Sequence, residues 1–359
     1  MLGVELLHEL GPIIAVPANS SRFYGNGIVA AQAQEGKIRL AWDDSDPYIF
    51  NLEYDASLIK YDEQYCTSVA ALGIEYSIPA LTYLPEVLKH LPKNPSISDI
   101  GCGQGEFVEE LRGRGLRAIG FDPVLRDTTD YLQAKYWQQE DPASDLYVLR
   151  CVLPHIQEPW KFLTLIAESS PGALVLVEFQ RLEWIIDKEI WYQLSHDHVN
   201  LFSFSDFVAR YKILDLGTFS NGEWGWVLLD PSSFSKPTKV VLENHEGLTS
   251  LFAAREKALQ EFDRISRPLA IWGASGKGIV LAHALKRSTD VELIAIDAHH
   301  RRWNKYLEVS GVEVLSPERA LRELSSKFLI LVCNPNHFEE VVEHVQGAFE
   351  IRIPSDFTR

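Results

Sequence analysis

A short loop with three glycines is the first feature of this 359-residue chain that could do chemistry. Gly101, Gly103 and Gly105 stand between a predicted strand, residues 96–101, and a predicted helix, residues 105–115. Glycine lets the backbone turn sharply and approach a ligand without an intervening Cβ atom. The first N–H groups of the helix point into the same space. The loop therefore predicts a site for a dinucleotide or for S-adenosylmethionine.

Two acidic residues beside the loop favour one of these ligands. Asp99 ends the strand before the loop, and Asp122 ends the next predicted strand, residues 117–122. A carboxylate in the second position can accept hydrogen bonds from both ribose hydroxyls. The motif GCGQGEF also departs from the GxGxxG fingerprint of dinucleotide sites. We therefore expect the loop to bind S-adenosylmethionine. The alternative is that the loop is a tight turn that binds no ligand. The predicted cofactor-binding residues are Asp99, Gly101, Gly103, Gly105 and Asp122.

Histidines form the second candidate group. His155 follows a predicted strand, residues 145–153, so it should face the crevice at the carboxyl ends of the strands. The segment Ser195-His196-Asp197-His198 places two histidines around an acid. Histidine, with an ordinary pKa of about 6.5, can exchange a proton at neutral pH. A base oriented by Asp197 is one interpretation and a polar surface turn is another, whereas a metal site lacks an obvious third ligand nearby.

A second glycine loop, GASGKG at residues 273–278, also follows a predicted strand and opens a helix. It is not a Walker A loop, because Ile271 stands where that motif needs its first glycine. Lys277 could bind a pyrophosphate, and Asp297, which ends the next predicted strand, could bind a ribose. We expect Gly273, Lys277 and Asp297 to bind substrate. In one alternative this loop only forms part of the wall of the active site. In another it binds NAD(P).

Alternating strands and helices must position both loops. Apolar runs of strand length alternate with helical patterns between residues 75 and 180, and again between residues 269 and 334. This alternation predicts parallel sheets with helices on both faces. We predict an α/β chain with a doubly wound Rossmann-like domain over residues 73–232 and a second Rossmann-like α/β domain over residues 240–359. Residues 1–72 lack the alternation and are predicted to form a small N-terminal subdomain or lid.

Composition excludes several classes of function. A net charge of −16 makes bare nucleic acid an unsuitable partner, because phosphate contacts need a basic face. The four cysteines lie far apart, which disfavours a structural zinc site and a disulfide framework. No apolar run is long enough for a membrane span, and the N-terminus lacks the basic region of a signal peptide. We expect a cytoplasmic monomer or homodimer without a metal.

Several segments, taken in order, resemble a known family. VLRCVLPHIQEPWKFL, ALVLVEFQRLEWII and EIWYQLSHDHVNLFSFSDF are followed by IWGASGKGIVLAHAL, IAIDAHHRRWNKYL, LSPERAL and VCNPNHFEEV. The first glycine loop resembles that of class I S-adenosylmethionine-dependent methyltransferases. The whole order, over about residues 50–359, resembles the sugar C-methyltransferases that act on nucleotide-linked 4-keto deoxysugars. The resemblance implies active-site roles for His155 and His198, with Asp197 in place of a glutamate, and matches Tyr54 to a tyrosine ahead of the cofactor domain.

The sequence departs from that family at two points. Ser195 replaces a tyrosine, and the family's four-cysteine zinc module is not found. The resemblance implies that His198, supported by Asp197, removes the proton on C3 of the sugar, while His155 hydrogen-bonds the resulting oxyanion. His196 is expected to contact the substrate. The same pocket could instead activate a hydroxyl and give an O-methyl sugar; an NAD(P)-dependent oxidoreductase and an inactive binding protein are the alternatives of other classes.

Overall fold

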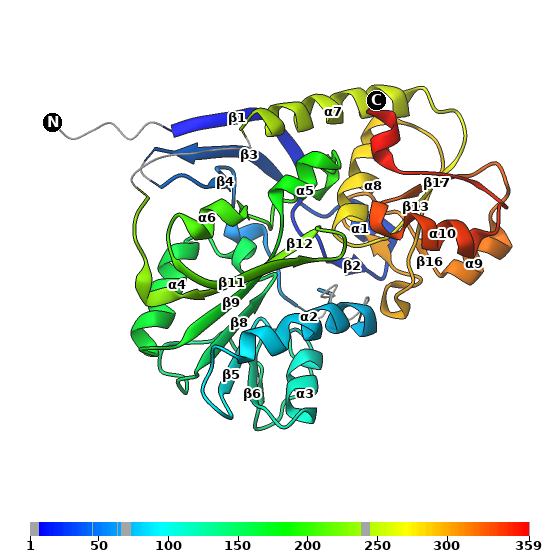
Figure 1. Cartoon of the computed structure of the whole chain (residues 1–359). Helices are drawn as coiled ribbons and strands as arrows, with labels where there is room; N and C mark the ends of the chain where they lie inside the picture. The colour runs from blue at the N-terminus through cyan, green and yellow to red at the C-terminus, as the bar shows by residue number, and fades with distance from the viewer. Residues whose placement is uncertain (1–6, 45, 63, 66–72, 238–244, 359) are drawn as a thin grey trace.

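A seven-stranded sheet forms the centre of the first α/β unit in the computed structural model, which describes residues 7–358 except 45, 63, 66–72 and 238–244 (Figure 1). The strand order is β11-β12-β9-β8-β5-β6-β7, in which β5 to β9 run parallel and β12 is antiparallel to both neighbours. The strands are β5 (Ser96–Ile100), β6 (Arg117–Phe121), β7 (Leu132–Gln133), β8 (Leu146–Arg150), β9 (Leu174–Gln180), β11 (Lys212–Phe219) and β12 (Trp224–Asp230).

Helices cover both faces of this sheet because its strands are apolar on both faces. In β8, Leu146 and Val148 pack with the helices of one face, whereas Tyr147 and Leu149 pack with those of the other. Successive side chains of a strand point to opposite faces, so such a run is buried on both sides. The helices of the first face are α2 (Gly73–Leu88) and α3 (Glu106–Gly113), and those of the second are α4 (Pro159–Ser169) and α6 (Phe204–Val208).

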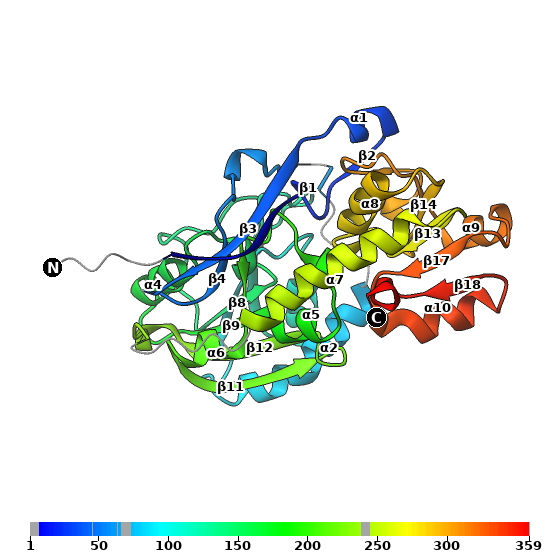
Figure 2. The same cartoon turned by 90° about the horizontal axis from the view of Figure 1, so that it is seen from above.

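A five-stranded parallel sheet forms the C-terminal part, in the order β16-β14-β13-β17-β18. Its strands are β13 (Leu269–Trp272), β14 (Leu293–Ile296), β16 (Val314–Leu315), β17 (Leu329–Val332) and β18 (Glu350–Arg352). One face packs on α7 (His245–Asp263) and α8 (Lys277–Ser288), and the other on α9 (Pro317–Glu323) and α10 (Phe338–Val345). Figure 2 shows α7 lying along α8 and β1.

The N-terminal part is built into both units. An antiparallel sheet, β1-β3-β4-β10, joins N-terminal strands to a strand that follows the predicted histidine segment, and a two-stranded pair joins β2 to β15 of the C-terminal part. The remaining elements are β1 (Leu7–Pro17), β2 (Phe23–Tyr24), α1 (Gly27–Ala31), β3 (Glu35–Asp43), β4 (Ile49–Asn51), α5 (Leu182–Asp187), β10 (Asn200–Leu201) and β15 (Tyr306–Leu307). Apolar residues of β1 and β3 share one core with α5, α7 and α8.

In each of the two larger sheets, the chain adds strands first on one side of the first strand and then on its other side. From β5 the chain moves to β6 and β7 on one side and then to β8 on the other, and β13 is followed in the same way by β14 and then β17. Ligands of such sheets bind in the crevice outside the carboxyl ends of the strands at this point. The predicted glycine loops follow β5 and β13, so each sheet offers one crevice. No helix within the described ranges is long and apolar enough to cross a membrane.

Candidate functional site

The loop after β5 has a backbone that only glycine suits. Gly101 has φ +74°, and a Cβ atom there would lie 2.3 Å from Val152; Gly105 has φ +93°, and a Cβ atom there would lie 2.7 Å from Leu132. Both φ values lie in the left-handed region that disfavours side chains. The Gly101 N–H group donates to the Phe121 carbonyl at 2.8 Å, which pins the loop to β6. The loop is therefore a rigid cradle between α3 and the strand ends.

Two predicted carboxylates border this cradle. Asp122 accepts hydrogen bonds from the N–H groups of Gly103 and Val124, each at 2.9 Å, so its carboxylate is fixed at the end of β6. Asp99 is 1% exposed, and its Oδ1 has no hydrogen-bond partner among the residues that the structure describes. Burial raises the pKa of Asp99 to about 7, against the opposing effect of Arg150. A buried, unpartnered carboxyl group is costly unless a ligand supplies a donor.

His155 and the segment around Asp197 meet at the same edge of the sheet. His155 ends a short 3-10 helix after β8, and its Nδ1 lies 2.7 Å from the backbone carbonyl of Asp197. Because a carbonyl only accepts, Nδ1 carries a proton, and Nε2 is free to face the crevice. The rings of His155 and His198 lie 4.6 Å apart between centroids and meet edge to face, at 73°.

Asp197 is held at one oxygen and free at the other. It is 1% exposed, and its Oδ2 accepts hydrogen bonds from the N–H and the hydroxyl of Ser20, at 2.9 and 2.7 Å. Its Oδ1 is buried and accepts no hydrogen bond within the described ranges. Burial opposes the charge of Asp197, but His198, His155 and the two bonds from Ser20 outweigh it and keep its pKa below the ordinary value. One carboxylate oxygen of Asp197 lies within 4.8 Å of a ring nitrogen of His155 and of His198, so a charged carboxylate stands beside both imidazoles.

The surroundings of His198 keep its imidazole neutral. Burial, together with the neighbouring His155, lowers the pKa of His198 below its ordinary value, so this imidazole is neutral at pH 7 and can accept a proton. One ligand atom from each of His155, Asp197 and His198 lies within 4.8 Å of the others, close enough to share a divalent cation. The sequence analysis found no third ligand near Asp197 and its histidine neighbours. In the structure His155, 42 residues before Asp197, takes that place.

The geometry does not support the predicted substrate contact of His196. This side chain is fully buried; its Nδ1 lies 2.8 Å from the Lys37 carbonyl and its Nε2 accepts from the Asp55 N–H at 3.1 Å. A Cβ atom on Gly36 would lie 2.3 Å from the His196 ring, so the ring packs directly against β3. His196 therefore ties the N-terminal sheet to the site. The half-buried Tyr54 stacks on its ring, with 5.6 Å between centroids.

The crevice of the C-terminal sheet is occupied by a side chain from the first unit. Glu223, in the turn between β11 and β12, is 2% exposed. Lys277, the first residue of α8, donates to it at 2.6 Å, and Asn334 and Asn336, which follow β17, donate at 2.9 and 3.0 Å. Glu223 thus bridges the two loops that would flank a ligand. The sequence analysis missed it, because nothing in the motif NGEWGWVLL indicates a distant partner.

Asp297, the predicted ribose ligand of the second loop, is also engaged by the protein. It accepts from the N–H groups of Ala274 and His299 at 2.7 and 2.8 Å, and forms a buried ion pair with Arg302 at 2.9 Å. The structure therefore does not support substrate contacts by Lys277 and Asp297, whose polar groups bind protein atoms. Gly273 takes a left-handed φ of +103° and belongs to the same closed loop.

Comparison with known proteins identifies the first unit. A family described as a methyltransferase domain matches residues 76–212. These residues are a class I S-adenosylmethionine-dependent methyltransferase domain. The chain is thus an S-adenosylmethionine-dependent methyltransferase whose catalytic domain is built on the seven-stranded sheet. No curated protein sequence matches the chain.

Three solved structures with a similar fold each cover less than half of this chain. One is CalO1, a methyltransferase in calicheamicin biosynthesis with bound S-adenosylhomocysteine, at 17% identity over 46% of this chain and 58% of that chain, TM-score 0.32. Another is magnesium protoporphyrin IX methyltransferase from Synechocystis PCC 6803, at 14% identity over 47% and 88%, TM-score 0.34. A third is an S-adenosylmethionine-dependent methyltransferase from Clostridium acetobutylicum ATCC 824, at 11% identity over 44% and 91%, TM-score 0.32.

The groups of the first crevice fit the methyl donor. S-adenosylmethionine carries an ammonium group and a ribose diol, both of which are hydrogen-bond donors. The unpartnered Oδ1 of Asp99 suits such a donor, and Asp122 stands where a carboxylate can accept from the ribose hydroxyls. At Gly101 and Gly105 the space that a Cβ atom would need is taken by Val152 and Leu132, so glycine preserves the shape of the loop beside these carboxylates.

Proposed function

We propose that the enzyme methylates an acidic carbon of a nucleotide-linked 4-keto deoxysugar, and that His198 is the base. The observation that carries the proposal is the group of His155, Asp197 and His198 at the edge of the seven-stranded sheet, in which the carboxylate is buried and the two histidines are half-buried. Two imidazoles and a carboxylate with one free oxygen form a set that can both remove and supply protons. The class of acceptor rests on the sequence resemblance described above.

The two histidines take opposite roles in this proposal. His198, neutral at pH 7, accepts the proton from the carbon next to the keto group, and the electron pair of the broken C–H bond moves into an enolate. His155 already donates Nδ1–H to the Asp197 carbonyl, so it can hydrogen-bond the enolate oxygen through Nε2 only as a protonated imidazolium. Asp197, whose carboxylate lies beside both rings, stabilises the positive charge that this arrangement needs.

The methyl donor, when bound, supplies an electrophilic methyl group on a sulfonium sulfur. The chain's own residues hold the carbon nucleophile at attacking distance from that methyl group. They also keep the abstracted proton on His198, away from the carbon nucleophile. The closed C-terminal crevice leaves the second sheet without a ligand of its own. We propose that this sheet is a Rossmann-like unit that supports the wall of the site through Glu223 and Ser20.

Solvent exchange tests the base directly. With thymidine diphosphate 4-keto-6-deoxyglucose as probe in D2O, and no methyl donor, the enzyme should exchange the proton at C3 for deuterium, which NMR detects. His198→Ala should slow this exchange by about 10²–10⁴-fold, the usual contribution of a general base, and leave the affinity for S-adenosylmethionine unchanged. His90→Ala, an exposed histidine at the end of α2, is the matched control and should change neither.

Two outcomes would overturn the proposal. If exchange persists in His198→Ala, His198 is not the base. If the unmodified enzyme shows no exchange, it does not abstract the proton at C3. Methylated product with the new methyl group on oxygen would favour the hydroxyl-activating alternative. EDTA should leave the rate unchanged; a loss that Zn²⁺ or Mn²⁺ restores would show that a cation occupies the histidine group instead.

A further inference from the structure

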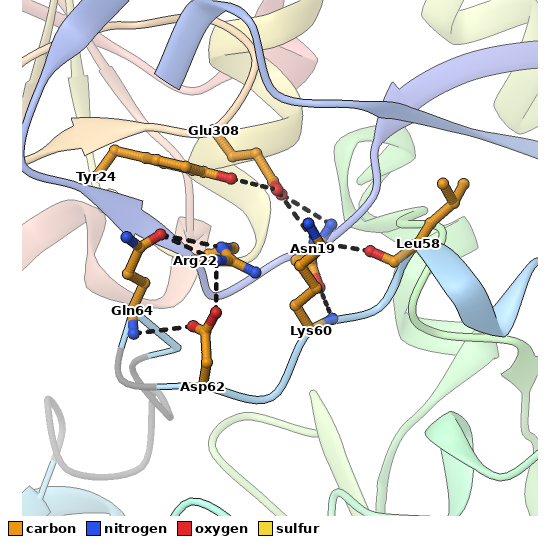
Figure 3. Close-up of polar contacts among 8 residues, drawn as sticks. All are labelled: Asn19, Arg22, Tyr24, Leu58, Lys60, Asp62, Gln64 and Glu308. Carbon is orange, nitrogen blue, oxygen red and sulfur yellow. Dashed lines mark hydrogen bonds and ion pairs between the residues drawn. The ribbon is translucent and has the colours of Figure 1, made fainter. Parts of the chain in front are cut away.

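A short N-terminal segment, residues 19–24, connects the catalytic group to the C-terminal part; we name it the strap. The strap begins after β1 and includes β2, which pairs with β15. Figure 3 shows its polar side chains between Glu308, from the C-terminal part, and the segment of residues 58–64. The strap is buried at Asn19, Ser20 and Arg22, which are at most 6% exposed. Such burial of polar residues requires partners for them.

Asn19 fixes the start of the strap (Figure 3). Its N–H and side-chain Nδ2 donate to the two oxygens of Glu308 at 2.8 and 3.0 Å, and its Oδ1 accepts from the Lys60 N–H at 3.0 Å. Tyr24 donates its hydroxyl to the same Glu308 carboxylate at 3.2 Å. Two residues of the strap thus share one buried carboxyl group of the C-terminal part.

Arg22 fixes the far side of the strap (Figure 3). Its guanidinium donates to Asp62 at 2.6 Å and to the side-chain oxygen of Gln64 at 3.0 Å. The Phe23 N–H donates to the Gln64 carbonyl at 3.1 Å, so main chain and side chain hold the same segment. With both ends anchored, Ser20 has little freedom to move.

Ser20 is the point at which the strap meets the catalytic group. Its N–H and its hydroxyl both donate to Oδ2 of Asp197, at 2.9 and 2.7 Å, and its carbonyl accepts from the Gly276 N–H at 2.7 Å. One residue therefore contacts the carboxylate beside the histidines and the glycine loop of the C-terminal sheet. Hydrogen bonds to a charged carboxylate are stronger than those between neutral groups.

We propose that Ser20 is a positioning residue that orients Asp197 for catalysis, held in place by the strap and the loop at Gly276. With Oδ2 fixed by two donors, the carboxylate is held in one orientation and keeps its place beside His155 and His198. The proposal rests on the proposed function, because the role of Asp197 is assigned there. The proposal also gives the C-terminal glycine loop a role that needs no ligand. The Gly276 N–H group holds Ser20, and Ser20 holds the Asp197 carboxylate.

The test compares Ser20 variants in the D2O exchange of thymidine diphosphate 4-keto-6-deoxyglucose. Ser20→Ala keeps the N–H bond and loses the hydroxyl bond, so the maximal exchange rate should fall roughly tenfold to a hundredfold. The KM for the sugar should stay within about twofold, since Ser20 contacts protein groups only in the described structure. Ser20→Thr restores the hydroxyl and should recover most of the rate. A purely structural role would not produce this separation of rate from KM.

Ser203→Ala is the matched control. Ser203 is also buried and donates its hydroxyl to a carboxylate, Oδ2 of Asp206 at 2.9 Å, but at the start of α6. It should keep the wild-type exchange rate. Should Ser20→Ala not fold, Ser20→Cys, a weaker donor of similar size, should give a rate below that of Ser20→Thr.

The outcomes separate this proposal from the one on which it rests. Asp197→Asn should abolish exchange; if it does not, the proposed function fails. If Asp197→Asn abolishes exchange while Ser20→Ala keeps the wild-type rate, only the positioning role fails. A Ser20→Thr variant that is as slow as Ser20→Ala would also overturn it.

Discussion

The two crevices of this molecule share a backbone design and differ in what fills them. In each, a glycine loop follows the first strand, and an aspartate at the end of the second strand accepts an N–H group from that loop: Asp122 from Gly103 and Asp297 from Ala274. In the methyltransferase domain Asp99 lies beside the loop with a buried oxygen that accepts no hydrogen bond from the described residues. In the C-terminal sheet, a buried carboxylate from the other unit, Glu223, stands between the loops.

The two crevices have a glycine loop and a strand-end acid in common, and they differ in the protein groups that bind their polar atoms. Asp297 forms a buried ion pair with Arg302, whereas Asp122 forms no ion pair with the residues that the structure describes. Lys277, the cation that could attract a phosphate, is neutralised by Glu223. What decides the function of each crevice is the set of protein groups already bound to its polar atoms.

The strongest test of this comparison replaces one glycine in each loop. Gly101→Ala combines a left-handed φ with a Cβ atom 2.3 Å from Val152, so the cradle must deform. Strain and overpacking of this kind cost a few kcal/mol together, and we expect the affinity for S-adenosylmethionine to fall by about 100-fold or more. Gly273→Ala has a left-handed φ too, but its Cβ atom would lie 3.5 Å from Cys333. It should leave that affinity unchanged in calorimetry, and equal losses in both variants would contradict the comparison.

Removing the charge that fills the second crevice should change stability instead of binding. Glu223→Gln leaves Lys277, whose side chain is 12% exposed, without its counter-charge. Breaking a buried pair at one partner costs roughly 3 kcal/mol in the free energy of unfolding, which urea denaturation measures. The double variant Glu223→Gln/Lys277→Met has no unpaired charge and should lose less than the sum of the single variants. Unchanged stability in Glu223→Gln would show that the crevice is not held closed by this contact.

The smallest expected effect is on the pH dependence of the rate, and it concerns the first crevice alone. The lowered pKa of His198 keeps this base neutral at pH values where an ordinary histidine is protonated, and its contribution is lost only as the pH falls through the lowered value. The maximal rate at pH 5.5 should therefore be at least about half of that at pH 6.5, whereas a base with the ordinary pKa of about 6.5 would lose roughly fivefold. A rate profile whose acid limb centres near pH 6.5 would contradict the assignment.

Much of the fold follows from the sequence because local patterns determine its elements. Strands β5, β6 and β8 and the glycine loop after β5 lie close to their predicted bounds. β1 was not predicted, since Gly11 and Pro12 interrupt its alternation and the register shifts between Leu10 and Ile14. Glu223, Ser20 and the burial of His196 depend on contacts between segments far apart in the chain. No local pattern encodes such partners, so the closed crevice appeared only in the structure.

Calorimetric titration of S-adenosylmethionine into the enzyme and two matched variants tests the central claim most directly. The account predicts one site per chain, an affinity at least about tenfold weaker in Asp122→Asn, which loses a charged acceptor at the first crevice, and an unchanged affinity in Asp297→Asn. Two sites per chain, or an affinity that Asp297→Asn weakens and Asp122→Asn preserves, would contradict it.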